Sequence, residues 1–182
     1  MKAPLFEYPS YQYQVDDFDF KKKGLLNRIK KDRMVRTELQ TFETDRSTNK
    51  KSYLHYFQDL IRPELSEFCM EAQVTCGMTD CWAVRYQKGD QQTVHNHRSW
   101  GFSGILYLEF DPRIHTPTCF VSPWQDPRSD TTTLAYPQNV WEGTIFIVPS
   151  YTLHFVHPNQ VRKHRTVIAF DLLPELPDHQ SV

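Results

Sequence analysis

The chain has 182 residues, enough to bury one hydrophobic core, and we expect a single domain over residues 1–182. Its 21 Lys and Arg nearly balance its 22 Asp and Glu, so the overall charge favours neither nucleic acid nor an anionic membrane surface as a partner. No segment approaches the roughly 18 consecutive apolar residues of a membrane span. The first ten residues lack the apolar core of a secretory signal, which predicts a cytoplasmic location.

Residues 1–80 are predicted to form an N-terminal arm and supporting helices. Residues 1–20 alternate aromatic and polar side chains, which is typical of a strand or an extended arm. Over residues 21–36 eight basic side chains meet one acidic one, and the apolar residues there have helical spacing, so we expect a helix with a solvated basic face. Apolar residues three or four apart predict a further helix over 53–70, interrupted at Pro63, that covers one face of a sheet.

Residues 81–172 are predicted to form the catalytic core, because the chain changes there to short segments rich in Val, Ile, Phe, Tyr and Thr. The predicted strands are 82–87, 101–110, 119–122, 143–149, 153–157 and 165–172. Several are apolar at successive positions, which indicates burial on both faces, as in a β-sandwich or barrel. Residues 173–182 are expected to form a surface tail. The four cysteines lack a C-x-x-C pair, so we expect free thiols.

Three histidines form a candidate metal site. His95 and His97 are spaced i and i+2 in a segment expected to be extended, so both imidazoles share one face. His154 lies in an otherwise apolar strand pair, where an imidazole needs a partner, and is the expected third ligand. His157 points to the opposite strand face and is assigned to the rim. The remaining histidines are expected at the surface: His55, His115, His164 and His179.

Three nitrogen ligands on one side of an ion leave other coordination positions open, which is typical of a catalytic rather than a structural site. Iron(II) fits best if the chemistry is oxidative, although zinc, nickel and copper also accept imidazole. Asp90 is not expected to supply a carboxylate ligand, because it belongs to a Gly89-Asp90 turn.

The runs WAVRYQKGDQQTVHNHRSWGFSGILYL, WEGTIFIVPSYTLHFVHPN and RTVIAFDL resemble the Fe(II)/2-oxoglutarate-dependent oxygenases, in the phage and bacterial branch near the prolyl-hydroxylase type. The resemblance covers roughly residues 80–172. It implies a mainly β fold with flanking helices around a double-stranded β-helix, also called a jelly-roll or cupin-like core. It also implies Fe(II), O2 and 2-oxoglutarate as cosubstrate, and hydroxylation of a substrate C–H bond. For a phage-encoded member the expected location is the host cytoplasm.

By this resemblance His95 is the first ligand of an H-x-D/E motif and His154 is the distal ligand. Arg165, eleven residues beyond His154, is the basic residue that binds the far carboxylate of 2-oxoglutarate. The sequence departs from the family at His97, where a carboxylate is usual, so the site carries one less negative charge. Thr118 is loosely similar to a family threonine.

Two tyrosines, Tyr86 and Tyr107, lie on predicted strands flanking the histidine pair and are candidates to bind a cosubstrate carboxylate. Arg85, Arg98 and Trp100 are candidates for the substrate side. The resemblance mildly favours a peptide or protein as substrate over a small molecule, and it leaves the oligomeric state open.

Two other functions remain open. The segments Gly-x5-His-x-His and Gly-x5-Pro, followed by a distal His, are also similar to a cupin, whose usual Glu after the second His is absent here. A cupin-type dioxygenase or isomerase would bind metal without 2-oxoglutarate, and Arg165 would then point away from the metal or pair with an internal acid. The second alternative is a non-catalytic metal-binding module with the same core.

Overall fold

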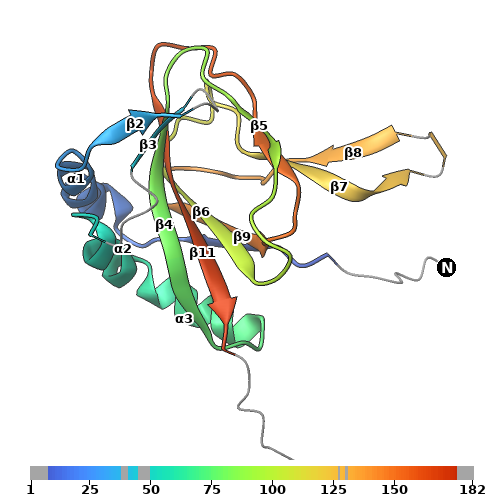
Figure 1. Ribbon diagram of the computed structural model, residues 1–182, viewed down its shortest axis with the longest axis horizontal. Helices are drawn as coiled ribbons and strands as arrows, with labels where there is room; N and C mark the ends of the chain where they lie inside the picture. The colour runs from blue at the N-terminus through green and yellow to red at the C-terminus, as the bar shows by residue number, and fades with distance from the viewer. Residues whose placement is uncertain (1–7, 38–40, 45–49, 127, 130, 176–182) are drawn as a thin grey trace, which may run out of the picture.

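The computed structural model describes residues 8–37, 41–44, 50–126, 128–129 and 131–175. Two antiparallel sheets face each other, and helices cover the outer side of the larger sheet (Figure 1). The helices are α1 Phe18–Ile29, α2 Leu54–Leu60 and α3 Arg62–Glu71. The larger sheet has the order β1-β9-β6-β11-β4-β3-β2, with β1 Tyr11–Gln14, β2 Met34–Arg36, β3 Phe42–Thr44, β4 Cys76–Tyr86, β6 Phe102–Glu109, β9 Thr144–Pro149 and β11 Arg165–Pro174.

The smaller sheet has the order β5-β10-β7-β8, with β5 Gln92–His95, β7 Cys119–Asp126, β8 Thr131–Ala135 and β10 His154–Val156. Each sheet therefore alternates strands from distant parts of the chain, which is the strand order of a double-stranded β-helix. The expected mainly β fold with flanking helices is confirmed. The strands β7 and β8 extend away from the body as a two-stranded arm (Figure 1).

Strand β11 lies at the centre of the larger sheet and is buried on both faces, as its continuous apolar sequence predicts. On the outer face Phe170 packs edge to face against Phe57 of α2, with ring centroids 5.6 Å apart. Gly104 on the neighbouring β6 makes room for this ring, because a Cβ atom there would lie 2.1 Å from the Phe170 ring. On the inner face Val167 and Ala169 point into the space between the sheets, where the candidate site lies.

The expected helix over residues 21–36 was wrong in its second half. Helix α1 ends at Ile29, and the backbone N–H groups of the next residues donate to the carbonyls of its last turn. The chain then forms β2, which pairs with β3, and Arg36 makes an ion pair with the buried Asp90. Pairing with a sheet edge and a buried partner therefore outweighs helix propensity in this segment.

The two ends of the predicted core also differ from expectation. Strand β4 begins at Cys76, ahead of the expected boundary at residue 81, and β11 extends through residues 173 and 174 of the expected tail. Within residues 1–20, β1 pairs with β9 as an added edge strand, which agrees with an arm packed on the body. Residues 1–7, residues 176–182 and His179 lie outside the described residues. No described helix has the length and apolar character needed to cross a bilayer.

Candidate metal centre and cosubstrate pocket

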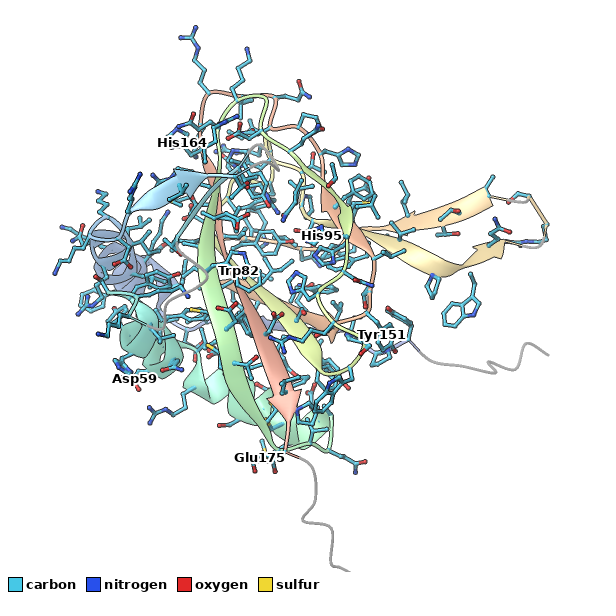
Figure 2. All side chains as sticks on the ribbon, viewed as in Figure 1. Asp59, Trp82, His95, Tyr151, His164 and Glu175 are labelled. Atoms are coloured by element: carbon cyan, nitrogen blue, oxygen red, sulfur yellow. The ribbon has the colours of Figure 1, made fainter. Side chains whose placement is uncertain are left out.

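The three histidines singled out from the sequence converge between the sheets. His95 ends β5, His154 begins β10, and the two residues are direct partners in the antiparallel register, with ring centroids 4.3 Å apart. His97 lies two residues beyond the end of β5, and its ring centroid is 5.1 Å from that of His154. One ligand nitrogen from each ring lies within 4.8 Å of the other two. Figure 2 shows His95 on the strand that borders this space.

Each imidazole is oriented by its Nδ1 atom, which lies within hydrogen-bond distance of an oxygen. The Nδ1–H of His95 donates to the carbonyl of Thr93 over 2.8 Å, and that of His154 donates to the carbonyl of Thr152 over 2.9 Å. The Nδ1–H of His97 donates to Oδ1 of Asp171 over 2.6 Å. Because these oxygens are acceptors, the proton is on Nδ1, and Nε2 is the nitrogen that each ring can offer to a metal.

The donor set fits a divalent transition metal. Burial, with the neighbouring His95, lowers the pKa of His154 to about 3, so its imidazole is neutral over the physiological range. A neutral imidazole is the form that coordinates a metal, and three of them suit iron, zinc, nickel or copper. His157 takes no part, because its Nε2 atom is bonded to the Tyr136 hydroxyl over 2.8 Å.

Asp171 was missed by the sequence reasoning, although it contacts a candidate ligand. Besides the bond from His97, its Oδ1 accepts a hydrogen bond from the Ser103 hydroxyl over 2.8 Å. Burial acts to raise the pKa of Asp171, but the bond from His97, aided by Ser103 and Arg98, outweighs burial, and the pKa lies below its usual value. A signal was present in the sequence: an acid directly after the apolar run 167–170, in the same alternation as Val167 and Ala169.

A narrow cavity between the sheets joins the histidines to Thr118. Its lining consists of Trp82, Val84, Tyr86, Gln92, His95, His97, Ile105, Thr118, His154, Val156, Val167 and Ala169. Half of these twelve side chains are apolar, and the polar groups among them are the three imidazoles, the Gln92 amide and the Thr118 and Tyr86 hydroxyls. This composition is typical of a small-molecule site.

Arg165 lies behind Thr118 with most of its hydrogen-bonding capacity unused. Its side chain is 2% exposed, and its Nη2 donates to Thr118 Oγ1 over 2.9 Å. Its Nε and Nη1 atoms are buried and have no partner among the described residues. A buried guanidinium with unpaired donors is costly unless an anion binds there. The residues present therefore fit the carboxylate of a cosubstrate.

Tyr86 and Tyr107 form the walls around this arginine. The guanidinium carbon lies 4.8 Å from the Tyr86 ring centroid and 5.6 Å from that of Tyr107, so both rings make cation–π contacts with it. The Tyr86 hydroxyl donates to Gln92 Oε1, and burial raises the pKa of Tyr86 to about 12, which keeps the phenol protonated. The Tyr107 hydroxyl accepts a hydrogen bond from the backbone N–H of Thr118.

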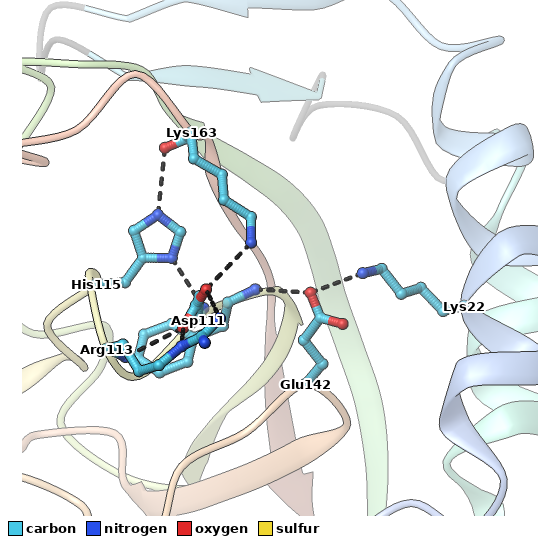
Figure 3. A network of polar contacts seen from close by, with 7 residues as sticks. Lys22, Asp111, Arg113, His115, Glu142 and Lys163 are labelled. Carbon is cyan, nitrogen blue, oxygen red and sulfur yellow. Dashed lines mark hydrogen bonds and ion pairs between the residues drawn. The ribbon is translucent and has the colours of Figure 1, made fainter.

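His115 was expected at the surface, and this expectation was wrong. The side chain is 5% exposed: its Nδ1 accepts from the backbone N–H of Asp111, and its Nε2 donates to the carbonyl of Lys163 (Figure 3). Asp111 is also bonded to Arg113 and Lys163. This network joins the turn that precedes Thr118 to the loop that precedes Arg165, and it therefore helps to hold these two residues together.

The three candidates for the substrate side lie in different places. Arg85 alternates with Val84 and Tyr86 along β4, so it faces away from the cavity. The Arg98 side chain is 41% exposed, with Nε 3.9 Å from Oδ2 of Asp171. Trp100 is exposed in the loop that follows His97. Arg98 thus lies beside the acid that contacts His97, whereas Arg85 does not face the candidate metal centre.

The comparisons with known proteins agree with this geometry. The model of the family described as "Putative 2OG-Fe(II) oxygenase" matches residues 80–171, just over half of the chain. No curated protein sequence matches the chain.

Solved structures of the same fold are similar to the chain at low identity. HygX of Streptomyces hygroscopicus, with nickel, 2-oxoglutarate and hygromycin B bound, has a TM-score of 0.71 at 12% identity, and the match covers 93% of this chain and 84% of the HygX chain. The viral collagen prolyl hydroxylase of Paramecium bursaria Chlorella virus-1, in complex with 2-oxoglutarate, has a TM-score of 0.61 at 15% identity. The match covers 91% of this chain and 96% of the hydroxylase chain. The family match, the histidine cluster and the shared fold together show that the chain belongs to the 2OG-Fe(II) oxygenase family and is an Fe(II)- and 2-oxoglutarate-dependent dioxygenase.

Proposed function

We propose that His95, His97 and His154 hold the iron, that Arg165 with Thr118 binds the distal carboxylate of 2-oxoglutarate, and that the enzyme hydroxylates a peptide or protein substrate. The observation that carries the first two assignments is the cavity itself. Three Nε2 donors lie in its lining together with Thr118, and Thr118 is bonded to a buried guanidinium with two unpaired nitrogens.

Bound Fe(II), with 2-oxoglutarate and dioxygen, supplies the oxidising power to insert oxygen into a C–H bond. The side chains of the chain provide binding and orientation. The unpaired Nε and Nη1 atoms leave hydrogen-bond donors available on both edges of the Arg165 guanidinium for a carboxylate, and the protonated Tyr86 phenol adds a polar group to the same cavity. The apolar lining residues exclude bulk water, which strengthens these electrostatic contacts.

The surroundings of Arg165 favour this function over a cupin-type enzyme that lacks 2-oxoglutarate. That alternative requires Arg165 to point away from the metal or to pair with an acid. Instead the guanidinium is bonded to a residue of the cavity lining, and no acidic side chain in the described part of the chain makes an ion pair with it.

Exposed aromatic side chains beside the metal centre support a peptide as substrate. Tyr8 contacts both Trp124 on β7 and Tyr151 edge to face, and Trp124 and Tyr151 are about half exposed. Asn96, between the two histidines of the pair, donates to the Tyr151 carbonyl, so this surface adjoins the metal ligands. Exposed Trp and Tyr are typical of the centres of protein interfaces.

The cysteines in the structure are free thiols, which supports a reducing compartment such as the cytoplasm.

Anaerobic titration of the Fe(II)-loaded protein with 2-oxoglutarate tests the metal centre and the cosubstrate. A weak visible charge-transfer band is expected in the wild type and in His157→Ala, because His157 bonds to Tyr136 and not to the metal. The band is expected to be absent in His154→Ala, which loses a buried ligand. A wild-type protein that binds iron without forming the band would favour the cupin-type alternative.

Stimulation of succinate release tests the substrate class. Pools of peptides and pools of small metabolites are compared as additions to the Fe(II)- and 2-oxoglutarate-saturated enzyme. We expect peptides to stimulate turnover, with a higher KM in Trp124→Ala. The KM should be unchanged in Phe20→Ala, since Phe20 is an even more exposed aromatic but lies on helix α1. Stimulation by a small molecule alone contradicts the peptide assignment.

A further inference from the structure

Asp171 is a buried acid in direct contact with a proposed metal ligand. It is 3% exposed and lies on β11, whose first eight residues are all buried. It follows Val167 and Ala169 in the alternation that faces the cavity. Removing a carboxylate from water costs several kcal/mol unless nearby groups compensate it. The contacts of Asp171 therefore indicate why a charge is kept at this position.

The contacts of Asp171 are concentrated on one oxygen. Its Oδ1 accepts from His97 Nδ1 over 2.6 Å and from the Ser103 hydroxyl over 2.8 Å. The Arg98 guanidinium is farther away, 3.9 Å from Oδ2, and its side chain is 41% exposed, so solvent screens this pair. Of these three groups, His97 therefore makes the closest contact with the carboxylate of Asp171.

The loop that carries His97 is also held by neutral bonds. The backbone N–H of His97 donates to the Ser150 carbonyl over 3.0 Å, and the hydroxyls of Ser150 and Ser103 are 2.9 Å apart. These bonds fix the backbone but not the charge or the tautomer of the imidazole. A purely structural role at position 171 would require an acceptor of the right shape, and an uncharged amide could provide it.

We propose that Asp171 is a positioning residue of the metal centre, which holds the Nδ1 proton of His97, directs Nε2 to the metal and increases its donor strength. This inference rests on the proposed function, because it requires metal on His95, His97 and His154. Three neutral imidazoles supply no negative charge to a divalent cation. A carboxylate on the far nitrogen of one ring supplies part of this charge through the ring, as in carboxylate–histidine–metal arrangements in general.

Metal affinity of the metal-free protein measures this effect without turnover. Co(II) and Fe(II) are titrated anaerobically against a chromophoric chelator, with thermal stability recorded in parallel. In Asp171→Asn, which keeps volume and an acceptor but removes the charge, we expect the metal Kd to rise by about 10- to 100-fold. The same variant is expected to shift the charge-transfer band with 2-oxoglutarate to higher energy, because a less electron-rich iron is harder to oxidise.

Two control variants separate the charge from the fold. Asp80→Asn removes a carboxylate from the residue opposite Asp171 in the register, where it contacts Lys51 rather than a histidine, and it is expected to keep wild-type affinity. Ser103→Ala removes the neutral partner of Asp171 and is expected to lower thermal stability while the metal Kd stays unchanged. Wild-type affinity in Asp171→Asn, or an equal loss in Ser103→Ala, would overturn the inference.

A measurement on the wild type covers the case in which Asp171→Asn does not fold. In the Zn(II)-loaded protein, NMR of the imidazole Nδ1–H protons compares the three ligands directly. The His97 proton is expected farthest downfield, because it alone donates to a carboxylate while those of His95 and His154 donate to carbonyls. A His97 proton at the position of the other two refutes the proposal. Wild-type protein that binds no metal refutes the metal centre itself, which is a different result from a wild type and variant of equal affinity.

Discussion

Replacing Arg165 with Met separates its role in binding from its role in stability. In the ligand-free protein the buried guanidinium makes one hydrogen bond, to Thr118, and two of its nitrogens have no partner. A buried charge without a counter-ion costs free energy, and an apolar side chain of similar length avoids this cost. We therefore expect the melting temperature of Arg165→Met without cosubstrate to be equal to that of the wild type or higher.

Cosubstrate binding should change in the opposite direction. Two charge-assisted hydrogen bonds to a carboxylate contribute at least about 3 kcal/mol together, and their loss raises the Kd for 2-oxoglutarate about a hundredfold. Anaerobic titration of the charge-transfer band measures this Kd. Arg85→Met is the matched control, because Arg85 faces away from the cavity on the adjacent β4, and its Kd should match the wild type.

Two results would refute this reasoning. Unchanged 2-oxoglutarate affinity in Arg165→Met means that the carboxylate binds elsewhere. A large fall in the melting temperature of the ligand-free variant means that the guanidinium is satisfied within the fold, contrary to its unpaired nitrogens.

Two further predictions concern the residues around this arginine. Thr118→Val removes the hydroxyl that accepts a hydrogen bond from the Arg165 guanidinium. It should weaken 2-oxoglutarate binding about tenfold, in line with one hydrogen bond to a charged group of about 1.5 kcal/mol. Thr118→Ser should restore binding, and equal losses in both variants would contradict a role for the hydroxyl. Burial lowers the pKa of His115 below its value in the unfolded chain, so the folded state favours the neutral imidazole. The stability that this neutral side chain contributes is therefore present above about pH 6.5. It is lost as the pH falls toward the pKa of the folded state. Urea unfolding from pH 7.5 to 5.5 should therefore show a smaller pH dependence in His115→Gln than in the wild type, and identical dependence would contradict this account.

Much of the fold followed from continuous apolar segments. The strands at 102–109, 144–149 and 165–174 were predicted nearly in full, because burial on both faces leaves a clear pattern. Strand β8 was missed because all five of its residues are exposed, so neither alternation nor an apolar run marks it. The basic segment was assigned to one helix because its charged residues do not distinguish a helix from an edge strand.

The candidate site was recovered in part, for reasons that differ by residue. The convergence of three histidines could be predicted from their spacing and apolar surroundings, and their roles as ligands stay a prediction. The burial of His115 could not be predicted, since its partners are backbone atoms of Asp111 and Lys163 that only the tertiary fold brings together. Asp171 required the strand register that places it opposite Ser103 and near His97.

The most direct test of the central claim is an anaerobic crystal structure of the Fe(II)–2-oxoglutarate complex with anomalous data collected at the iron edge. We predict one anomalous peak about 2.1 Å from Nε2 of His95, His97 and His154, the usual metal–imidazole distance, with a carboxylate of 2-oxoglutarate on Arg165. A peak bound by other residues, or 2-oxoglutarate bound away from Arg165, would contradict the account.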